Sequence, residues 1–130
     1  MVVHSLSEEN AVRAAAEVEA AGGRPAFAVA GSMDEPGTSE ALARMVRTHL
    51  GGLDILVNNA GIDNFDPVDA ISPQTWAKVL GVNLDGPYLA CRALLPLLRE
   101  RGGAIATWRR RRRWSAVGGC QRTRPPRVPS

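Results

Sequence analysis

Apolar residues along the chain form short continuous runs that alternate with stretches of helical periodicity. Such runs are typical of strands that are buried on both faces of a parallel sheet. They predict three strands, at residues 1–3, 25–30 and 53–57. Between the runs, apolar residues recur at helical spacing, which indicates one helix that begins after Ser5 or Ser7 and another at 38–50. A pair of glycines follows each helix and supplies the left-handed conformation that ends it.

A third helix is predicted to begin at Ser72, which caps it, and to run to about Arg99. A local distortion is expected where Gly86-Pro87 interrupts the helical pattern. Another strand follows at 104–106. Strands and helices therefore alternate along the chain. This alternation predicts the α/β class, with a doubly wound parallel sheet that is covered by helices.

Charge divides the chain into two parts. Residues 1–106 carry 8 basic and 13 acidic side chains, whereas residues 107–130 carry 8 arginines and no acidic residue. The overall net charge of +3 therefore describes neither part. We expect an acidic folded body at 1–106 and a basic, disordered tail at 107–130.

Several classes of protein are excluded by the sequence. No apolar run approaches the roughly 20 residues that a membrane-spanning helix needs, and the first residues run into Glu8 and Glu9 without the apolar segment of a signal peptide. Cys91 and Cys120 form neither a CxxC motif nor a disulfide framework. The two histidines alone cannot make a metal site, so no metal is expected. These observations predict a cytoplasmic protein with reduced thiols.

The segment that follows the strand at 53–57 is the sharpest candidate for a binding site. It reads Asn58-Asn59-Ala60-Gly61. In parallel sheets, ligands bind at the carboxyl ends of the strands. Ala60 and Gly61 leave room for a flat ligand against the backbone, and Asn58 can bond either a ribose or a neighbouring strand. The alternative is a tight strand exit made of turn-forming residues.

Three motifs together resemble the short-chain dehydrogenase/reductase family. They are LDILVNNAGI at 53–62, Val82-Asn83-Leu84 in the following helix, and RGGAI at 101–105. The resemblance covers roughly residues 1–106 and implies a partial Rossmann-like, dinucleotide-binding domain. It also implies NAD(P)-dependent oxidoreduction of a small-molecule carbonyl or alcohol substrate, and full-length relatives that are homo-oligomers.

The same resemblance assigns roles to individual residues. Asn58, Ala60 and Gly61 would line the cofactor, and Ser32 stands where the family has an aspartate that contacts adenine. Asn83 would be the asparagine of the catalytic tetrad. In the family its helix is locally bent, and its backbone carbonyl holds a water in a proton relay. Without the resemblance, Asn83 is a polar residue on a helix face.

Two departures from the family concern the cofactor. The glycine-rich turn that cradles the pyrophosphate is absent and is expected before Met1, because residues 1–3 match the second strand of the family. Members selective for NAD carry an aspartate after that strand, where this chain has His4 and Ser5. No carboxylate there repels a 2′-phosphate, which favours NADP over NAD.

Other departures concern catalysis, because the Tyr-xxx-Lys pair of the family is not found. The only tyrosine, Tyr88, has Arg92 four residues later and lies in the wrong helix, so we expect it to be a packing residue. The only lysine, Lys78, has no tyrosine four residues before it. We therefore expect an incomplete fold, without its first strand and C-terminal half, that is marginally stable and transfers no hydride by itself.

The basic tail has two interpretations. The resemblance stops at about residue 106, and arginine, tryptophan and proline then dominate. This abrupt change predicts that the DNA is read in a shifted frame from that point. Alternatively, the arginines at 109–113 bind phosphates while Trp108 and Trp114 stack on bases, which would make the tail a nucleic-acid-binding segment.

Overall fold

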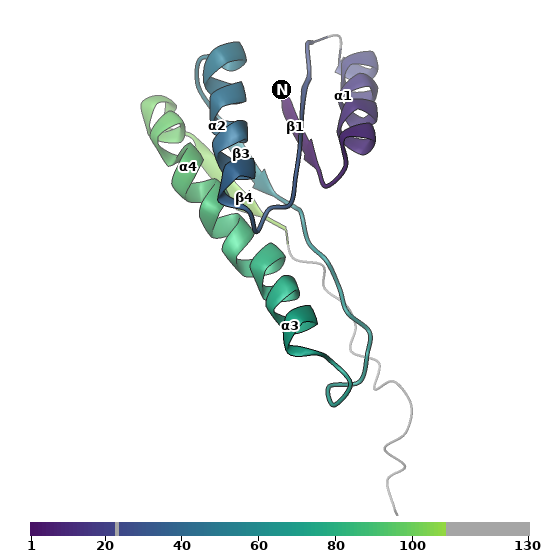
Figure 1. The fold of residues 1–130 in the computed structure, drawn as a ribbon. Helices are drawn as coiled ribbons and strands as arrows, with labels where there is room; N and C mark the ends of the chain where they lie inside the picture. The colour runs from purple at the N-terminus through teal and green to yellow at the C-terminus, as the bar shows by residue number, and fades with distance from the viewer. Residues whose placement is uncertain (23, 109–130) are drawn as a thin grey trace, which may run out of the picture.

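The computed structural model describes residues 1–22 and 24–108, and Figure 1 shows their arrangement. The elements are β1 (Val2–Ser5), α1 (Glu8–Gly22), β2 (Phe27–Ala30), α2 (Pro36–Leu50), β3 (Ile55–Asn58), α3 (Pro73–Leu80), the π-helical turn η1 (Gly81–Asp85), α4 (Gly86–Arg101) and β4 (Ala104–Thr107). Strands and helices alternate as the sequence predicts. The α/β class is therefore confirmed.

All strand pairing in the described residues is parallel, but it forms two separate pairs. β1 pairs with β2, with Val2 opposite Phe27, and β3 pairs with β4, with Ile55 opposite Ala104. No backbone ladder joins β1 to β3 within residues 1–22 and 24–108. The structure thus contains part of a doubly wound parallel sheet.

Helices cover the two strand pairs differently. α1 and α2 both pack on β1 and β2, while α4 packs on β3 and β4. Figure 1 shows α1 on the side of β1 and β2 that faces away from α2. α2 and α4 also pack against each other, so this helix pair connects the two pairs of strands.

The core lies where α2 meets α4 and the strands beneath them. Val46 of α2 packs with Leu94 and Leu97 of α4, and Ala90 packs with Val29 of β2. Leu94 is 2% exposed and Ala90 is 1% exposed. Burial of a large aliphatic side chain contributes roughly 1.5–3 kcal/mol, so this contact is the main apolar connection between the two halves of the described chain.

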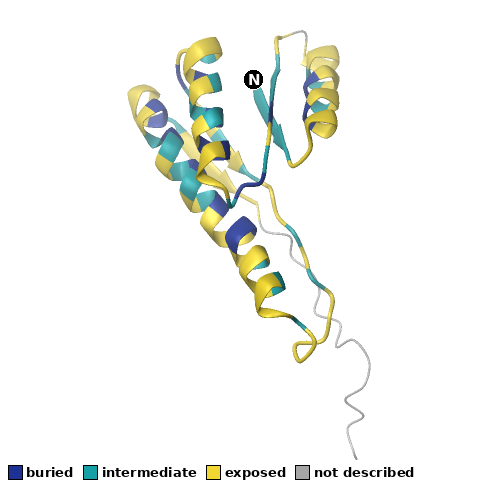
Figure 2. Cartoon of the chain, viewed as in Figure 1, coloured by how far each residue is buried: buried dark blue, intermediate teal, exposed yellow. Residues whose placement is uncertain are grey.

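The apolar runs predict strands that are buried on both faces, and this prediction is wrong for the second strand pair, β3 and β4. Ile55 and Val57 of β3 are 62% and 60% exposed, and every residue of β4 is exposed. Figure 2 shows the same contrast in colour. The physical reason is that α4 is the one described helix that packs on β3 and β4, so one face of this pair has no cover among the described residues.

Some boundaries also differ from the predicted ones. β1 extends through Ser5, so His4 and Ser5 lie inside the strand instead of after it. α2 begins at Pro36, before the predicted start, because proline suits the first turn of a helix. The distortion expected at Gly86-Pro87 occurs one turn earlier, in η1, and α4 begins at Gly86.

None of the described helices combines the length and the apolar composition that crossing a bilayer requires. Within the same residues, no three His, Cys, Asp or Glu side chains gather in a way that could hold a metal ion. The arginine-rich segment at 109–130, with the frameshift and nucleic-acid interpretations that rest on it, lies outside the described residues.

Candidate functional site

The carboxyl end of β3 carries the segment that the sequence singles out. β3 ends at Asn58, and residues 59–61, which follow it, are exposed. Asn58 Nδ2 donates a hydrogen bond to Cys91 Sγ of α4 at 3.5 Å. Sulfur is a weak acceptor, so this contact orients Asn58 toward the helix more than it stabilises the fold. Ala60 carries only a methyl group and Gly61 no side chain, so the backbone is accessible at this end of the strand.

Asn83 of η1 reaches back to this segment and holds it with both ends of its amide. Asn83 Oδ1 accepts a hydrogen bond from Ile62 N at 2.9 Å, and Asn83 Nδ2 donates one to Ile62 O at 2.8 Å. A Cβ on Gly61 would lie 3.1 Å from Asn83 Oδ1, so glycine permits this close approach. The structure therefore brings together Gly61 and Asn83, two of the residues that the sequence singles out.

A change in helix type accompanies Asn83. The five residues of η1 form a π-helical turn between α3 and α4, and the N–H of Gly86 donates to the carbonyl of Gly81, five residues earlier. Single π turns inside helices are frequent at functional sites. The resemblance implies a local bend at Asn83, and in this chain Asn83 lies within the π turn.

Ser32 lies after β2, in a cluster of its own. It is 8% exposed, and its hydroxyl donates to Asp34 Oδ1 in a short hydrogen bond. Lys78 Nζ donates to the same hydroxyl at 2.9 Å and contacts both carboxylate oxygens of Asp34, at 2.9 and 2.8 Å. The hydroxyl hydrogen of Ser32 is therefore used within the protein.

Electrostatics in this cluster favour the charged form of Asp34. The hydrogen bond from Lys78, followed by the one from Ser32, lowers the pKa of Asp34 below its usual value. The side chain of Asp34 is 21% exposed and that of Lys78 is 49% exposed. Sequence reasoning missed this cluster, because a lysine and an aspartate 44 residues apart carry no local signal.

The structure also places two other residues that the sequence analysis considers. His4, at the position associated with cofactor choice, has its Nε2 within 2.9 Å of the carbonyl oxygen of Gly31, so it joins the ends of β1 and β2. Tyr88 was expected to be a packing residue, which is wrong, because it is 60% exposed. The residues of α4 that are buried in the clusters with α2 are instead Ala90, Leu94 and Leu97.

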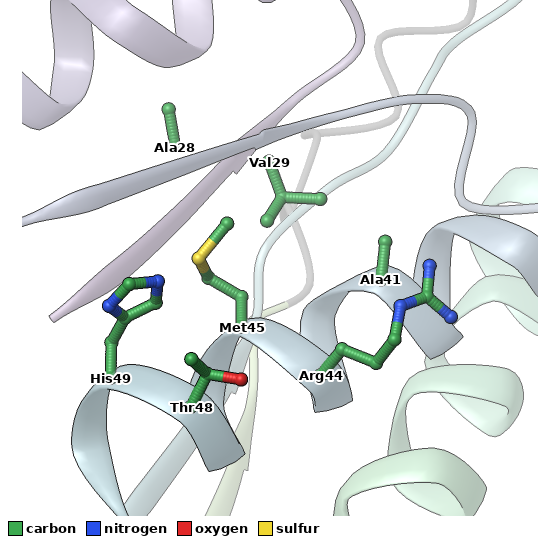
Figure 3. A pocket seen from close by; sticks show the side chains of 7 residues that line it. All are labelled: Ala28, Val29, Ala41, Arg44, Met45, Thr48 and His49. Carbon is green, nitrogen blue, oxygen red and sulfur yellow. The ribbon is translucent and has the colours of Figure 1, made fainter.

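An open hollow of about 340 Å³ lies between β2 and α2 (Figure 3). Its lining consists of Ala28, Val29, Ala41, Arg44, Met45, Thr48 and His49. The imidazole of His49 also stacks on Phe27, with ring centroids 4.1 Å apart. None of the residues that the sequence assigns to a cofactor lines this hollow, so it is separate from the candidate site.

Comparison with known proteins agrees with the motifs. The family model for short chain dehydrogenase matches residues 1–108. Among curated proteins, the short chain dehydrogenase pigC of Monascus ruber is 48% identical over 67 residues, which are 51% of this chain and 22% of that protein. Dehydrogenase/reductase SDR family member 4 of Oryctolagus cuniculus is 33% identical over 107 residues, 79% of this chain and 40% of that protein.

Solved structures show the same relationship. L-sorbose reductase from Gluconobacter frateurii, complexed with NADPH and L-sorbose, matches with a TM-score of 0.76 and 28% identity, over 82% of this chain and 41% of that one. Gluconate 5-dehydrogenase from Burkholderia cenocepacia, in complex with NADP and tartrate, matches with a TM-score of 0.70 and 32% identity, over 82% and 42% of the two chains. The chain thus spans less than half of each of these relatives. Because the family model covers most of its length, the chain belongs to the short-chain dehydrogenase/reductase family.

Proposed function

We propose that the protein is an NAD(P)-dependent oxidoreductase that transfers hydride between the nicotinamide and a small carbonyl or alcohol substrate. This chain would supply the cofactor-facing end of β3 and the π turn η1, which carries Asn83. The observation that carries the proposal is the closed pair of hydrogen bonds between Asn83 and Ile62 beside Gly61. It fixes a small-residue segment at the carboxyl end of a parallel strand, where such sheets bind nucleotides.

The residues present fit a nicotinamide cofactor at this end of β3. Ala60 and Gly61 are exposed and carry little or no side chain, so a flat ring can approach their backbone. When bound there, the cofactor would donate or accept the hydride. We favour NADP over NAD, because β1 ends in His4 and Ser5 without a carboxylate. The two structural neighbours described above are complexes with NADPH and with NADP.

Asn83 would act through its backbone. Both polar ends of its side chain are engaged by Ile62, so the side chain holds the segment after β3 in place. The family resemblance assigns the backbone carbonyl of Asn83 to a water in a proton relay, and the π turn is the feature of this chain that supports such a role. Ser32 would take part by shaping the segment after β2, since its hydroxyl hydrogen is already used.

For the 130 residues alone, we propose weak cofactor binding without turnover. Tyr88 is followed four residues later by Arg92, and Lys78 is held by Asp34 and Ser32. Neither residue therefore supplies the proton donor that carbonyl reduction requires. We expect a dissociation constant for NADPH on the order of 1 mM, which corresponds to about −4 kcal/mol.

Titration of the isotopically labelled chain with NADPH, followed by amide NMR signals, tests this proposal. We expect the largest shifts at residues 59–62. Gly61→Val should abolish them, because a side chain there meets Asn83. Gly37→Val is the matched control, since a Cβ at Gly37 meets nothing within 4 Å. Shifts that leave residues 59–62 unchanged would contradict the proposed site, and NADH that binds as tightly as NADPH would contradict the preference for NADP.

A further inference from the structure

The segment Ser32–Asp34 lies against the continuous helical rod formed by α3, η1 and α4. A Cβ placed on Gly81 would lie 3.0 Å from Asp34 Cβ, and one placed on Gly86 would lie 2.9 Å from Met33 Cβ. Both distances are shorter than ordinary contacts between such atoms. Glycine at both positions therefore allows the segment to approach the helix backbone.

The π turn places these two glycines on one side of the rod. In a regular α-helix each residue advances about 100°, so residues five apart would point roughly 140° away from each other. In η1 the N–H of Gly86 donates to the carbonyl of Gly81, which closes a wider turn over the same five residues. The wider turn brings both glycines to the face that contacts Met33 and Asp34.

Lys78 lies three residues before Gly81 and thus extends the same helix face. Its ammonium group has three donors, and the structure gives it three acceptors: Ser32 Oγ at 2.9 Å, Asp34 Oδ1 at 2.9 Å and Asp34 Oδ2 at 2.8 Å. Ser32 is 8% exposed, so part of this network is shielded from water. The bond to Ser32 thus adds a shielded contact to an ion pair that is itself partly exposed and would contribute little alone.

We infer that Lys78 is a positioning residue that fixes the Ser32–Asp34 segment on the π turn that also carries Asn83. The segment after β2 and the segment after β3 are then attached to one short piece of helix, the first through Lys78 and the second through Asn83. Loosening the first contact should therefore loosen the second. The inference rests on the proposed function in one respect, which is that these two segments face the cofactor.

Hydrogen exchange of single amides, measured without any cofactor, tests the coupling. The N–H of Glu35 bonds to the carbonyl of Ser32, and the N–H of Ile62 bonds to Asn83 Oδ1, so each amide reports on one segment. In Lys78→Met we expect both amides to exchange roughly three- to tenfold faster, because a hydrogen-bonded charge has been removed. Lys78→Arg should restore slow exchange, since arginine also donates to carboxylates.

Arg101→Met is the matched control, because it removes another ion pair, between Arg101 and Asp54, which precedes β3, whereas residues 59–62 follow the other end of that strand. It should change neither amide. Unchanged exchange of Glu35 in Lys78→Met overturns the inference. Faster exchange of Glu35 with no change at Ile62 also overturns it, because Lys78 would then act on its own segment alone.

Lysine labelled with ¹⁵N gives an independent signature, since Lys78 is the only lysine in the chain. Its single Nζ signal should move as acid protonates Asp34, and this movement should vanish in Asp34→Asn. A signal that moves identically in both proteins overturns the contact. An NADPH titration of the same samples separates the two proposals. Coupled exchange without any response to NADPH refutes the proposed function and supports the role of Lys78. A response at 59–62 without coupled exchange supports the proposed function and refutes the role of Lys78.

Discussion

The two strand pairs are built from similar apolar runs, yet they differ in how helices cover them. β1 and β2 lie between α1 and α2, and Val29 of β2 is 6% exposed. β3 and β4 contact α4, and Ile55 and Val57 remain mostly exposed. Apolar surface is stabilising only when it leaves water, at roughly 25 cal/mol per Å². Residues of equal hydrophobicity therefore contribute unequally to the stability of the two strand pairs, and substitutions can measure the difference.

The largest effect is expected at the contact that connects the two pairs. Leu94→Ala removes a side chain that is 2% exposed and packs between α4 and α2. We expect a loss of about 2–5 kcal/mol, from lost burial and from the cavity left behind. Urea denaturation followed by circular dichroism measures it. Leu84→Ala is the control, since Leu84 is 64% exposed; equal effects of the two substitutions would refute this description of the core.

The second prediction compares the two pairs directly with one isosteric change. Val29→Thr places a hydroxyl at a buried position of β2 and should cost about 1–3 kcal/mol. Val57→Thr makes the same change in β3, where the side chain is 60% exposed, and should stay within about 0.5 kcal/mol. Unfolding midpoints of the two variants report the difference. A comparable loss from Val57→Thr would mean that another part of the protein covers β3 in solution.

The third prediction concerns the helix caps in the two regions. Ser72 Oγ accepts a hydrogen bond from Thr75 N at 3.0 Å at the start of α3, whereas Ser7 Oγ accepts one from Asn10 N at 3.4 Å before α1. Ser72→Ala should cost about 1 kcal/mol, and Ser7→Ala should cost less because its bond is longer. Thermal melts of both variants test this prediction. A larger fall in melting temperature for Ser7→Ala than for Ser72→Ala would contradict it.

The smallest effect on stability should come from lowering the pH. The pKa of Asp34 is lowered in the folded protein, so its contribution to stability is present above the unfolded value of 3.8 and is lost as the pH falls through the lower folded value. Because Lys78 is about half exposed, we expect at most about 1 kcal/mol. Urea unfolding at pH 6 and at pH 3 should show a smaller loss in Asp34→Asn than in the unchanged chain. An equal loss in both would contradict the prediction.

Local patterns in the sequence predicted the local features of the fold. Helical periodicity and terminal glycines located α1 and α2, and the alternation of elements gave the parallel pairing. The strand exit at 58–61 and Asn83 were found because several short motifs occur together at fixed spacing. These features depend on residues that are near one another in the chain.

Other features depend on contacts between distant segments and could not be predicted in this way. Lys78 meets Asp34 across 44 positions, and Asn58 meets Cys91 across 33. A local distortion was expected at Gly86-Pro87, but the π turn lies before it, at Gly81–Asp85, where Gly81 and Gly86 allow the helix to approach Asp34 and Met33. The open face of β3 was missed because an apolar run does not report which helix covers it.

The π turn holds one residue more than a regular helix would need. The N–H of Gly86 bonds to a carbonyl five residues back, so deleting one residue within η1 would let it bond four residues back, as in an α-helix. Because the extra residue lies in the wide turn, α4 would keep its orientation relative to α3, and Ala90 and Leu94 would still face α2. A deletion between Gly86 and Ala90 that left η1 in place would instead rotate these two residues by about 100°. The helix should therefore tolerate the loss of one residue within η1 but not in the first turn of α4, whereas the mostly exposed loop at 63–70 should tolerate both insertions and deletions.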